Sequence, residues 1–157
     1  DNPGGLLDSV CDILRKILPE GLIVYTEDKD GNREEEKCDG KNELRIPLAV
    51  LVNESSASAS EIFAGAVQDY GIGTIVGTTT FGKGVVQSIR QLSDGSAIKL
   101  TVANYYTPKG NNINKTGIKP DIEVSLDTRL LNKNKDEITH EEDKQLQEAI
   151  KAVEKEK

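Results

Sequence analysis

The chain has 157 residues, of which 36% are hydrophobic and 30% are charged, a composition typical of one globular domain with a buried core. The formal net charge of −7 disfavours nucleic acid and anionic lipid as main partners, because both repel a negative surface. No apolar run approaches the roughly 20 residues that span a bilayer.

The first part of the chain predicts a helix followed by strands. Apolar residues recur at helical spacing over 6–18, and Pro19 ends that helix. The pattern then favours a strand at 22–26 and a polar edge strand at 33–37. A nearly continuous apolar run at 46–52 predicts a strand that is buried on both faces.

The second part predicts another helix and a hairpin. Helical spacing returns at 62–70, and Gly71 ends the helix. Strands are predicted at 74–76, 85–92, 97–106 and 121–124. The turn Ser93-Asp94-Gly95 joins two of them as a hairpin, and a loop occupies 108–119. Strands that alternate with helices place the chain in the α/β class, with the hairpin appended.

Two apolar patterns predict how later elements are buried. Ile98, Leu100 and Val102 alternate with polar residues, which predicts one buried and one wetter face for that strand. From Asn132 the chain is highly charged and then helical. Its thin apolar stripe of Leu146, Ile150 and Val153 predicts a terminal helix docked on the surface, or one that packs on an absent part.

Three features of the sequence do not support the chemistry that their residue types suggest. Cys11 and Cys38 form no metal or redox motif, so two buried or free thiols are favoured over a disulfide, which stays open. His140 is the sole histidine and lies in an acidic stretch, so a Ser-His-Asp triad is nearly excluded. Asp28-x-Asp30-x-Asn32 resembles the start of a calcium loop, but a hairpin turn is the favoured interpretation because the loop's glycine and final glutamate are missing.

The first candidate site is the joint between the strand at 46–52 and the next helix. Ser58 lies there among small serine and alanine residues that let a substrate backbone approach closely. A helix N-terminus offers unpaired N–H groups and a positive dipole end to a developing oxyanion. The alternative is a serine-rich helix cap without chemistry.

The second candidate is the glycine- and threonine-rich loop at 77–84, which contains Lys83. It nearly matches a phosphate-binding loop, but Gly84 replaces the magnesium-binding hydroxyl and a strand pattern follows. We therefore reject a nucleotide-hydrolysing function. A solvated loop lysine is the alternative for Lys83. If Ser58 is a nucleophile, lysine is the available base.

These segments together resemble a protease family. The string at 51–62, which contains Ser-Ala-Ser-Ala-Ser, and Phe-Gly-Lys-Gly-Val-Val-Gln at 81–87 are similar to signatures of the carboxy-terminal processing proteases, also called tail-specific proteases. Asn-Pro-Gly-Gly-Leu at 2–6, Tyr-Tyr-Thr-Pro at 105–108 and Gly-Ile-Lys-Pro-Asp at 117–121 match further segments in the same order.

The resemblance implies roles for individual residues. Ser58 is the expected nucleophile, Lys83 its general base, and Gln87 the residue that orients the lysine amine. The expected oxyanion-hole donors are the N–H groups of Ala59 and Gly4, with Gly5 as the competing second donor.

A lysine amine is protonated at neutral pH, so a catalytic one needs surroundings that favour its uncharged form. Phe81, Val85 and Val86 are the apolar neighbours expected to bury the amine of Lys83.

The resemblance also implies the fold and the function of the whole protein. We expect a ClpP/crotonase-like α/β core with a mixed sheet over 1–127, truncated at its N-terminus, and a charged linker with a helix over 128–157. The expected activity is endopeptidase cleavage near protein C-termini, without metal or cofactor, outside the cytoplasm (periplasm, cell envelope or secreted).

The expected partners are polypeptide C-termini and a PDZ domain of the same protein, which is absent here, so this fragment alone can be inactive. A homo-oligomer stays open. The alternative function is a catalytically silent domain that binds peptide or a partner subunit.

Overall fold

The computed structural model describes residues 1–130 and 133–155 of the chain, so Asn132, where the charged segment was predicted to begin, lies outside the described residues. The elements in chain order are α1 (Leu7–Leu14), β1 (Glu20–Asp28), β2 (Arg33–Asp39), β3 (Ala49–Val52), α2 (Ala59–Tyr70), β4 (Thr74–Gly77), β5 (Val85–Gln91), β6 (Ala97–Tyr106), β7 (Ile122–Glu123), two 3₁₀ turns (Thr128–Leu130 and Lys135–Glu137) and α3 (Lys144–Lys155).

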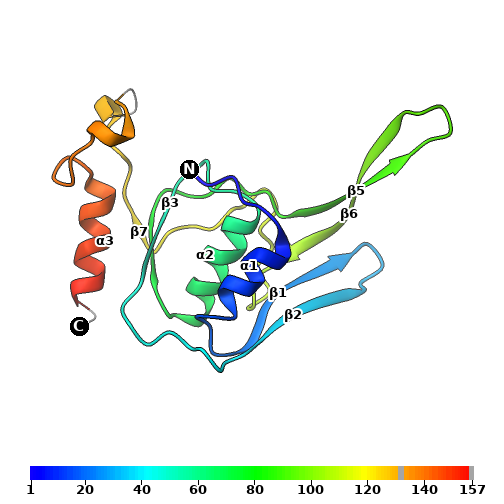
Figure 1. Cartoon of the computed structure of the whole chain (residues 1–157), viewed down its shortest axis with the longest axis horizontal. Helices are drawn as coiled ribbons and strands as arrows, with labels where there is room; N and C mark the ends of the chain where they lie inside the picture. Colours follow the sequence, from blue (N-terminus) through cyan, green and yellow to red (C-terminus); the bar gives the residue numbers. More distant parts are fainter. Residues whose placement is uncertain (131–132, 156–157) are drawn as a thin grey trace.

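Within these residues the strands form two sheets (Figure 1). One is four-stranded and antiparallel, in the order β2-β1-β6-β5. The other is three-stranded and parallel, in the order β3-β4-β7. The predicted α/β class with flanking helices and an appended hairpin is confirmed, and its mixed strand directions are divided between the two sheets.

The hydrophobic core surrounds α2, which packs against α1, β1 and β4. Its small residues allow a close approach, since a Cβ added at Gly65 would lie 2.8 Å from Thr107 Cγ2. Val67 of α2, Leu14 of α1 and Ile23 of β1 are fully buried in this core, and burial of such a side chain stabilises the fold by about 1.5–3 kcal/mol. The core thereby fixes the first turn of α2 relative to both sheets.

The predicted end of α2 is correct, although the helix begins at Ala59, three residues before the predicted spacing, and the predicted end of α1 is wrong. Gly71 ends α2 in the left-handed conformation, with φ of 66°, as the glycine signal predicts. The helix α1 ends at Leu14, earlier than expected, because the N–H groups of Lys16 and Ile17 bond the carbonyl groups three residues back. Leu18 follows in a turn and is nonetheless fully buried.

The prediction of a strand over 46–52 that is buried on both faces is wrong. Only Ala49–Val52 forms β3, Leu51 is 47% exposed and Ile46 is 65% exposed. The reason is topological: in the described part of the chain, β3 lies at the edge of its sheet and pairs with β4 alone.

The prediction of one buried face for the hairpin is also wrong. Ile98, Leu100 and Val102 are 44%, 45% and 43% exposed. The strand β1 pairs with β6 only over 103–106, so the distal part of β5 and β6 projects from the body (Figure 1). The alternation of apolar and polar residues predicted the strand β6 correctly, but it did not predict that its apolar face would stay exposed.

The terminal helix α3 packs against β3 and β4, which confirms the predicted docking on the surface. It buries Ala149 and Ala152, whereas Ile150 of the predicted stripe is exposed. In residues 1–130 and 133–155, no helix is long and apolar enough to cross a membrane.

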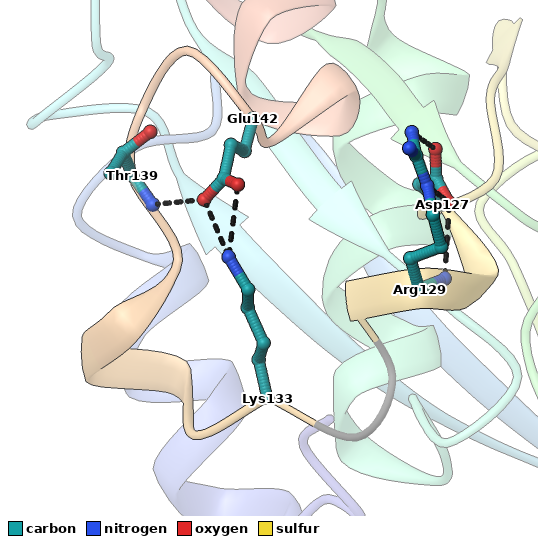
Figure 2. Close-up of polar contacts among 5 residues, drawn as sticks. All are labelled: Asp127, Arg129, Lys133, Thr139 and Glu142. Carbon is teal, nitrogen blue, oxygen red and sulfur yellow. Dashed lines mark hydrogen bonds and ion pairs between the residues drawn. The ribbon is translucent and has the colours of Figure 1, made fainter.

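Exposed polar contacts hold the connection from β7 to α3 (Figure 2). Lys133 Nζ donates to both carboxylate oxygens of Glu142 at 2.9 and 3.1 Å, and the Thr139 N–H donates to Glu142 Oε2 at 3.3 Å. Hydrogen bonds from Arg129 hold the pKa of the Asp127 carboxyl below its usual range. Exposed pairs of this kind contribute little to stability, so this cluster adds little to the free energy of folding.

The sequence 28–32 forms a hairpin turn, as predicted. Asp28 accepts hydrogen bonds from the N–H groups of Asp30 and Asn32 and from Asn32 Nδ2, at 2.8 to 2.9 Å. In the part of the chain that the structure describes, no three His, Cys, Asp or Glu side chains are arranged to hold a metal ion.

Cys11 and Cys38 are buried free thiols, as predicted. Desolvation, followed by the negative charge of Glu36, raises the pKa of the Cys11 thiol to about 11. The unfolded thiol ionises near pH 9, so between pH 9 and 11 the unfolded state binds fewer protons than the folded state. Stability from this group is therefore lost as the pH rises through that window.

We expect the free energy of unfolding of the wild type to fall more steeply than that of Cys11→Ala between pH 9 and 11, by about 1.4 kcal/mol per pH unit at most. Urea titrations of both proteins at pH 8, 9, 10 and 11 measure this difference. Parallel pH profiles would contradict the buried, protonated state of Cys11.

Candidate active site

Ser58 lies at the joint between β3 and α2 and has an unusual backbone conformation. Its φ is 59° and its ψ is −120°, and Lys115 is the other non-glycine residue with positive φ in the described chain. Such a conformation costs on the order of 1–3 kcal/mol and is found mainly at functional sites. A sharp strand-to-helix turn of this kind presents a serine hydroxyl outward, and Ser58 is partly exposed.

The glycine turn at the start of the chain lies directly against this joint. The φ of Gly4 is 92°, and an added Cβ would lie 2.5 Å from Ala57 O, 2.8 Å from Ala59 N and 3.0 Å from Ser58 Cβ. A Cβ added at Gly5 would meet nothing within 4 Å. Contact with the joint therefore favours Gly4 over Gly5 as the second oxyanion donor.

In this structure the Gly4 N–H is already engaged. It donates to Asn2 Oδ1 at 3.0 Å, and the Ala57 N–H donates to the Asn2 carbonyl oxygen at 3.0 Å. An oxyanion at this position would have to replace the side-chain oxygen of Asn2. The Ala59 N–H opens α2, where helical N–H groups have no intrahelical partner and the dipole favours negative charge.

The carboxylate of Glu61 joins the Ser58 turn to the Lys83 loop. Glu61 is fully buried. Its Oε2 accepts the N–H groups of Ser58 and Lys83, each at 2.8 Å. Its Oε1 accepts the Gly82 N–H at 2.7 Å and the Thr80 hydroxyl at 2.5 Å.

One oxygen atom therefore holds both candidate catalytic residues by their backbones. Since Ser58 N and Lys83 N each lie 2.8 Å from Glu61 Oε2, they are no more than twice that distance apart. The shared acceptor atom therefore fixes how far apart the two backbones can lie. The structure thus brings together two residues that are remote in sequence.

Further backbone contacts fix the Lys83 loop on both sides. The Phe81 N–H donates to the Ser56 carbonyl oxygen at 2.9 Å, and the Lys115 N–H donates to the Gly82 carbonyl oxygen at 2.8 Å. A Cβ at Gly84 would lie 2.4 Å from Asn114 N, so only glycine fits there. The strand β5 follows Lys83, so no helix begins at the end of this loop as a phosphate-binding loop requires, in agreement with rejection of that function.

The expected burial of the Lys83 side chain is wrong for this chain. Lys83 is exposed, Phe81 is 66% exposed, and Val85 and Val86 are half-buried. The physical reason is the projecting hairpin: beyond Val86, which lies opposite Ala103, it is no longer paired with β1, so its apolar residues do not cover the amine. The backbone of Lys83 is fixed beside Ser58 while its side chain is open to solvent.

Gln87 lies in β5 just after a bulge between Val86 and Gln87, opposite Thr101, and is exposed. It is on the strand that leads away from Lys83. Its orienting role stays a prediction.

Inspection of the sequence missed Glu61 and Thr80. The spacing Ser58-x-x-Glu61 is that of a capping box, which predicts a contact between Glu61 and the Ser58 N–H. It gives no sign of the bonds to the 80–83 loop, because those depend on the tertiary packing of two segments.

Comparison with known proteins identifies relatives of this chain. Residues 1–124 match the pattern of peptidase family S41. The chain is 52% identical over 121 residues to a carboxyl-terminal-processing protease of Synechocystis, a match that covers 77% of this chain and 28% of that protein. It is 44% identical over 132 residues to a chloroplastic C-terminal processing peptidase of Tetradesmus obliquus, which covers 83% of this chain and 28% of the relative.

The fold has a solved counterpart. The photosystem II D1 C-terminal processing protease aligns with a TM-score of 0.75 and 42% identity, over 83% of this chain and 35% of that one. The matched region thus spans about a third or less of the length of each of these relatives.

Proposed function

The chain belongs to peptidase family S41, and on that premise we propose that its protein is a serine endopeptidase that uses Ser58 and Lys83 as a catalytic pair. Glu61 carries this proposal, because its buried carboxylate holds the backbones of the two residues side by side. The strained conformation of Ser58 supports a nucleophile at that position.

The proposed reaction is hydrolysis of a peptide bond in two steps. The uncharged Lys83 amine takes the hydroxyl proton of Ser58 as Oγ bonds to the substrate carbonyl carbon. The oxyanion accepts hydrogen bonds from the Ala59 and Gly4 N–H groups. The carbon–nitrogen bond then breaks, and the Lys83 ammonium gives its proton to the leaving amine.

Water completes the cycle. It adds to the carbonyl carbon of the ester while Lys83 again takes a proton, and the ester bond to Ser58 Oγ breaks. Lys83 returns that proton to Ser58 Oγ, and the new carboxylic acid departs and loses its remaining proton to solvent, so one water has been added across the peptide bond. No metal or cofactor has a role in this scheme.

The site requires rearrangement before it can act in this way. The exposed Lys83 amine must be shielded from water and contact the Ser58 hydroxyl, and the Gly4 N–H must leave Asn2 Oδ1. Active sites often reach productive geometry only in the substrate complex. We propose that other parts of the full-length protein, among them a PDZ domain, and the bound peptide complete this change.

A serine-reactive phosphonate probe tests the proposal. We expect the full-length protein to be labelled at Ser58 and at no other serine, with the site read by mass spectrometry. The variant Ser58→Ala should not be labelled. An unlabelled but folded wild-type protein would contradict the enzyme proposal and would instead support a silent peptide-binding domain, which the exposed Lys83 side chain also allows.

The substrate class and the location are part of the same proposal. The names of the relatives support cleavage near polypeptide C-termini, and one relative is named chloroplastic. We propose an extracytoplasmic location for this protein and leave a homo-oligomer open.

A further inference from the structure

The three-stranded sheet β3-β4-β7 lies between two helices (Figure 1). The helix α2 packs against β4 from the side of the core, and α3 packs against β3 and β4 from the opposite side. Parallel sheets are usually covered on both faces, and here α3 supplies the second cover. The match to peptidase family S41 ends at residue 124, so α3 lies outside the matched region, and none of the roles proposed above involves it.

The strand β4 shows what α3 covers. Ile75 and Val76 are both 0% exposed, and successive side chains of a strand point to opposite faces. Ile75 belongs to the core around α2, which does not include Val76, so Val76 points to the face on which α3 packs. On α3 itself, Ala149 and Ala152 are buried and lie three residues apart on one side of the helix. Their small side chains let the helix approach the sheet closely.

The docking of α3 depends on a small interface. Gln145 Nε2 donates to the Val124 carbonyl oxygen at 2.9 Å, and Asp143 Oδ1 accepts the Leu146 N–H at 3.0 Å in the first turn. An isolated helix of 12 residues is marginal in water, so α3 stays ordered only while it packs on the sheet. A single charge on its buried side should therefore detach it.

The strand β3 connects this interface to the candidate active site. Asn53 follows β3 directly, its N–H donates to Ser56 Oγ at 3.0 Å, and its carbonyl oxygen accepts the Ser56 N–H at 2.9 Å. Ser56 is buried, and its carbonyl oxygen accepts the Phe81 N–H of the Lys83 loop at 2.9 Å. In the described chain β3 pairs with β4 alone, so its position depends strongly on what packs on its faces. A shift of β3 would therefore move both the Ser58 turn and the Lys83 loop.

We propose that Ala149 and Ala152 are positioning residues for the catalytic pair, because they dock α3 on the sheet that carries the Ser58 turn. With α3 docked, the sheet is fixed between two helices and the turn is fixed with it. With α3 detached, β3 and the turn loosen and the chemical step slows. The inference rests on the proposed serine peptidase function and adds an element on which the same site depends.

Two variants of the full-length protein test the inference. Ala149→Glu and Ala152→Glu each place a charge on the buried side of α3. We expect kcat per folded molecule to fall by at least about tenfold with KM little changed, because a displacement of about 1 Å at a catalytic group costs about 10²-fold. Labelling of Ser58 by the phosphonate probe should slow by the same factor. Urea unfolding measures the folded fraction of each variant.

Matched substitutions separate detachment from a change of charge or composition in α3. Ile150→Glu adds the same charge to the middle of the same helix, at a position that is 39% exposed, and should keep the wild-type kcat. Ala152→Ser keeps a small side chain on the buried side and should also keep the wild-type kcat.

Hydrogen exchange of a milder variant tests the coupling without a buried charge. Gln145→Leu removes the bond to the Val124 carbonyl oxygen, and deuterium uptake read by mass spectrometry should become about fivefold faster in 144–155, the effect of one hydrogen bond on an opening equilibrium. Uptake in 53–58 should accelerate with it. Gln147→Leu is the control, since Gln147 Nε2 donates to the His140 carbonyl oxygen at 2.8 Å and not to the end of β7, and it should leave uptake in 53–58 unchanged.

The outcomes separate this inference from the proposed function. If the wild type cleaves peptides, but the glutamate variants release α3 and keep the wild-type kcat and labelling, α3 only covers the sheet and the inference is wrong while the peptidase stands. If the glutamate variants do not fold, the exchange of Gln145→Leu decides: faster uptake in 144–155 alone overturns the inference, and faster uptake in both segments supports it. If the folded wild type cleaves nothing and Ser58 is unlabelled, both proposals are overturned.

Discussion

Replacing Ser58 or Lys83 by alanine in the full-length protein is expected to lower kcat by at least about 10⁴-fold while each variant remains folded. Ser58→Ala removes the atom that forms the ester, and Lys83→Ala removes the base that takes its proton. Because the two act as a unit, the double variant should be no slower than either single one. Initial rates on a C-terminally free peptide, together with thermal unfolding, measure both effects.

Matched substitutions control for loss of a hydroxyl or an amine in general. Ser55→Ala changes an exposed serine of the same loop, and Lys99→Ala changes an exposed lysine of β6. Both should keep wild-type kcat and stability. Lys83→Arg tests proton transfer separately, because a guanidinium keeps the charge but does not act as a base, and it should be as inactive as Lys83→Ala. Normal turnover by Ser58→Ala or Lys83→Ala would refute the catalytic pair.

Local pattern was sufficient to predict most elements of the fold. The helix ended by Gly71 and the hairpin around Ser93-Asp94-Gly95 were correct because their signals are local: side-chain periodicity and the backbone freedom of glycine. The α/β class followed from their order.

Burial was predicted less well, because it depends on what lies next to an element. The apolar run that includes Leu51 predicts a fully buried strand. In the described chain, however, β3 lies at a sheet edge and Leu51 is exposed. The alternation of Ile98 and Leu100 with polar residues predicts a buried face. This part of β6 extends beyond its pairing with β1, so both side chains are exposed. The exposure of Lys83 has the same origin at the base of that hairpin.

The sequence indicated the site only through the small residues around Ser58 and through the resemblance to the carboxy-terminal processing proteases. Ser58 and Lys83 are far apart in the chain, and neither has a neighbour pattern that requires contact with the other. What joins them is Glu61, whose role is not visible until the loop at 80–83 is seen to donate into its carboxylate. A carboxylate with four donors on two segments acts as a positioning residue for both.

Replacing Glu61 by glutamine is therefore expected to damage both stability and rate. Its amide keeps one acceptor oxygen and adds donors, so whichever way it turns, two of the four donors lose their acceptor. Buried donors left without partners should lower the free energy of unfolding by about 3 kcal/mol. A shift of the Lys83 loop by about 1 Å should lower kcat by about 10²-fold, with KM little changed. Urea unfolding and steady-state kinetics, normalised to folded protein, measure the two effects.

The split between kcat and KM distinguishes positioning from loss of fold. Asp121→Asn is the matched control: Asp121 also joins separate segments, since it accepts the Ile75 N–H at 2.7 Å and Gln68 Nε2 at 2.8 Å, but it contacts neither candidate catalytic residue through these bonds. It should lower stability while kcat per folded molecule stays at the wild-type value, because the Ser58–Glu61–Lys83 junction is intact. If Glu61→Gln loses stability but keeps wild-type kcat and probe labelling at Ser58, the carboxylate supports the fold alone, and the geometric basis for pairing Ser58 with Lys83 is lost.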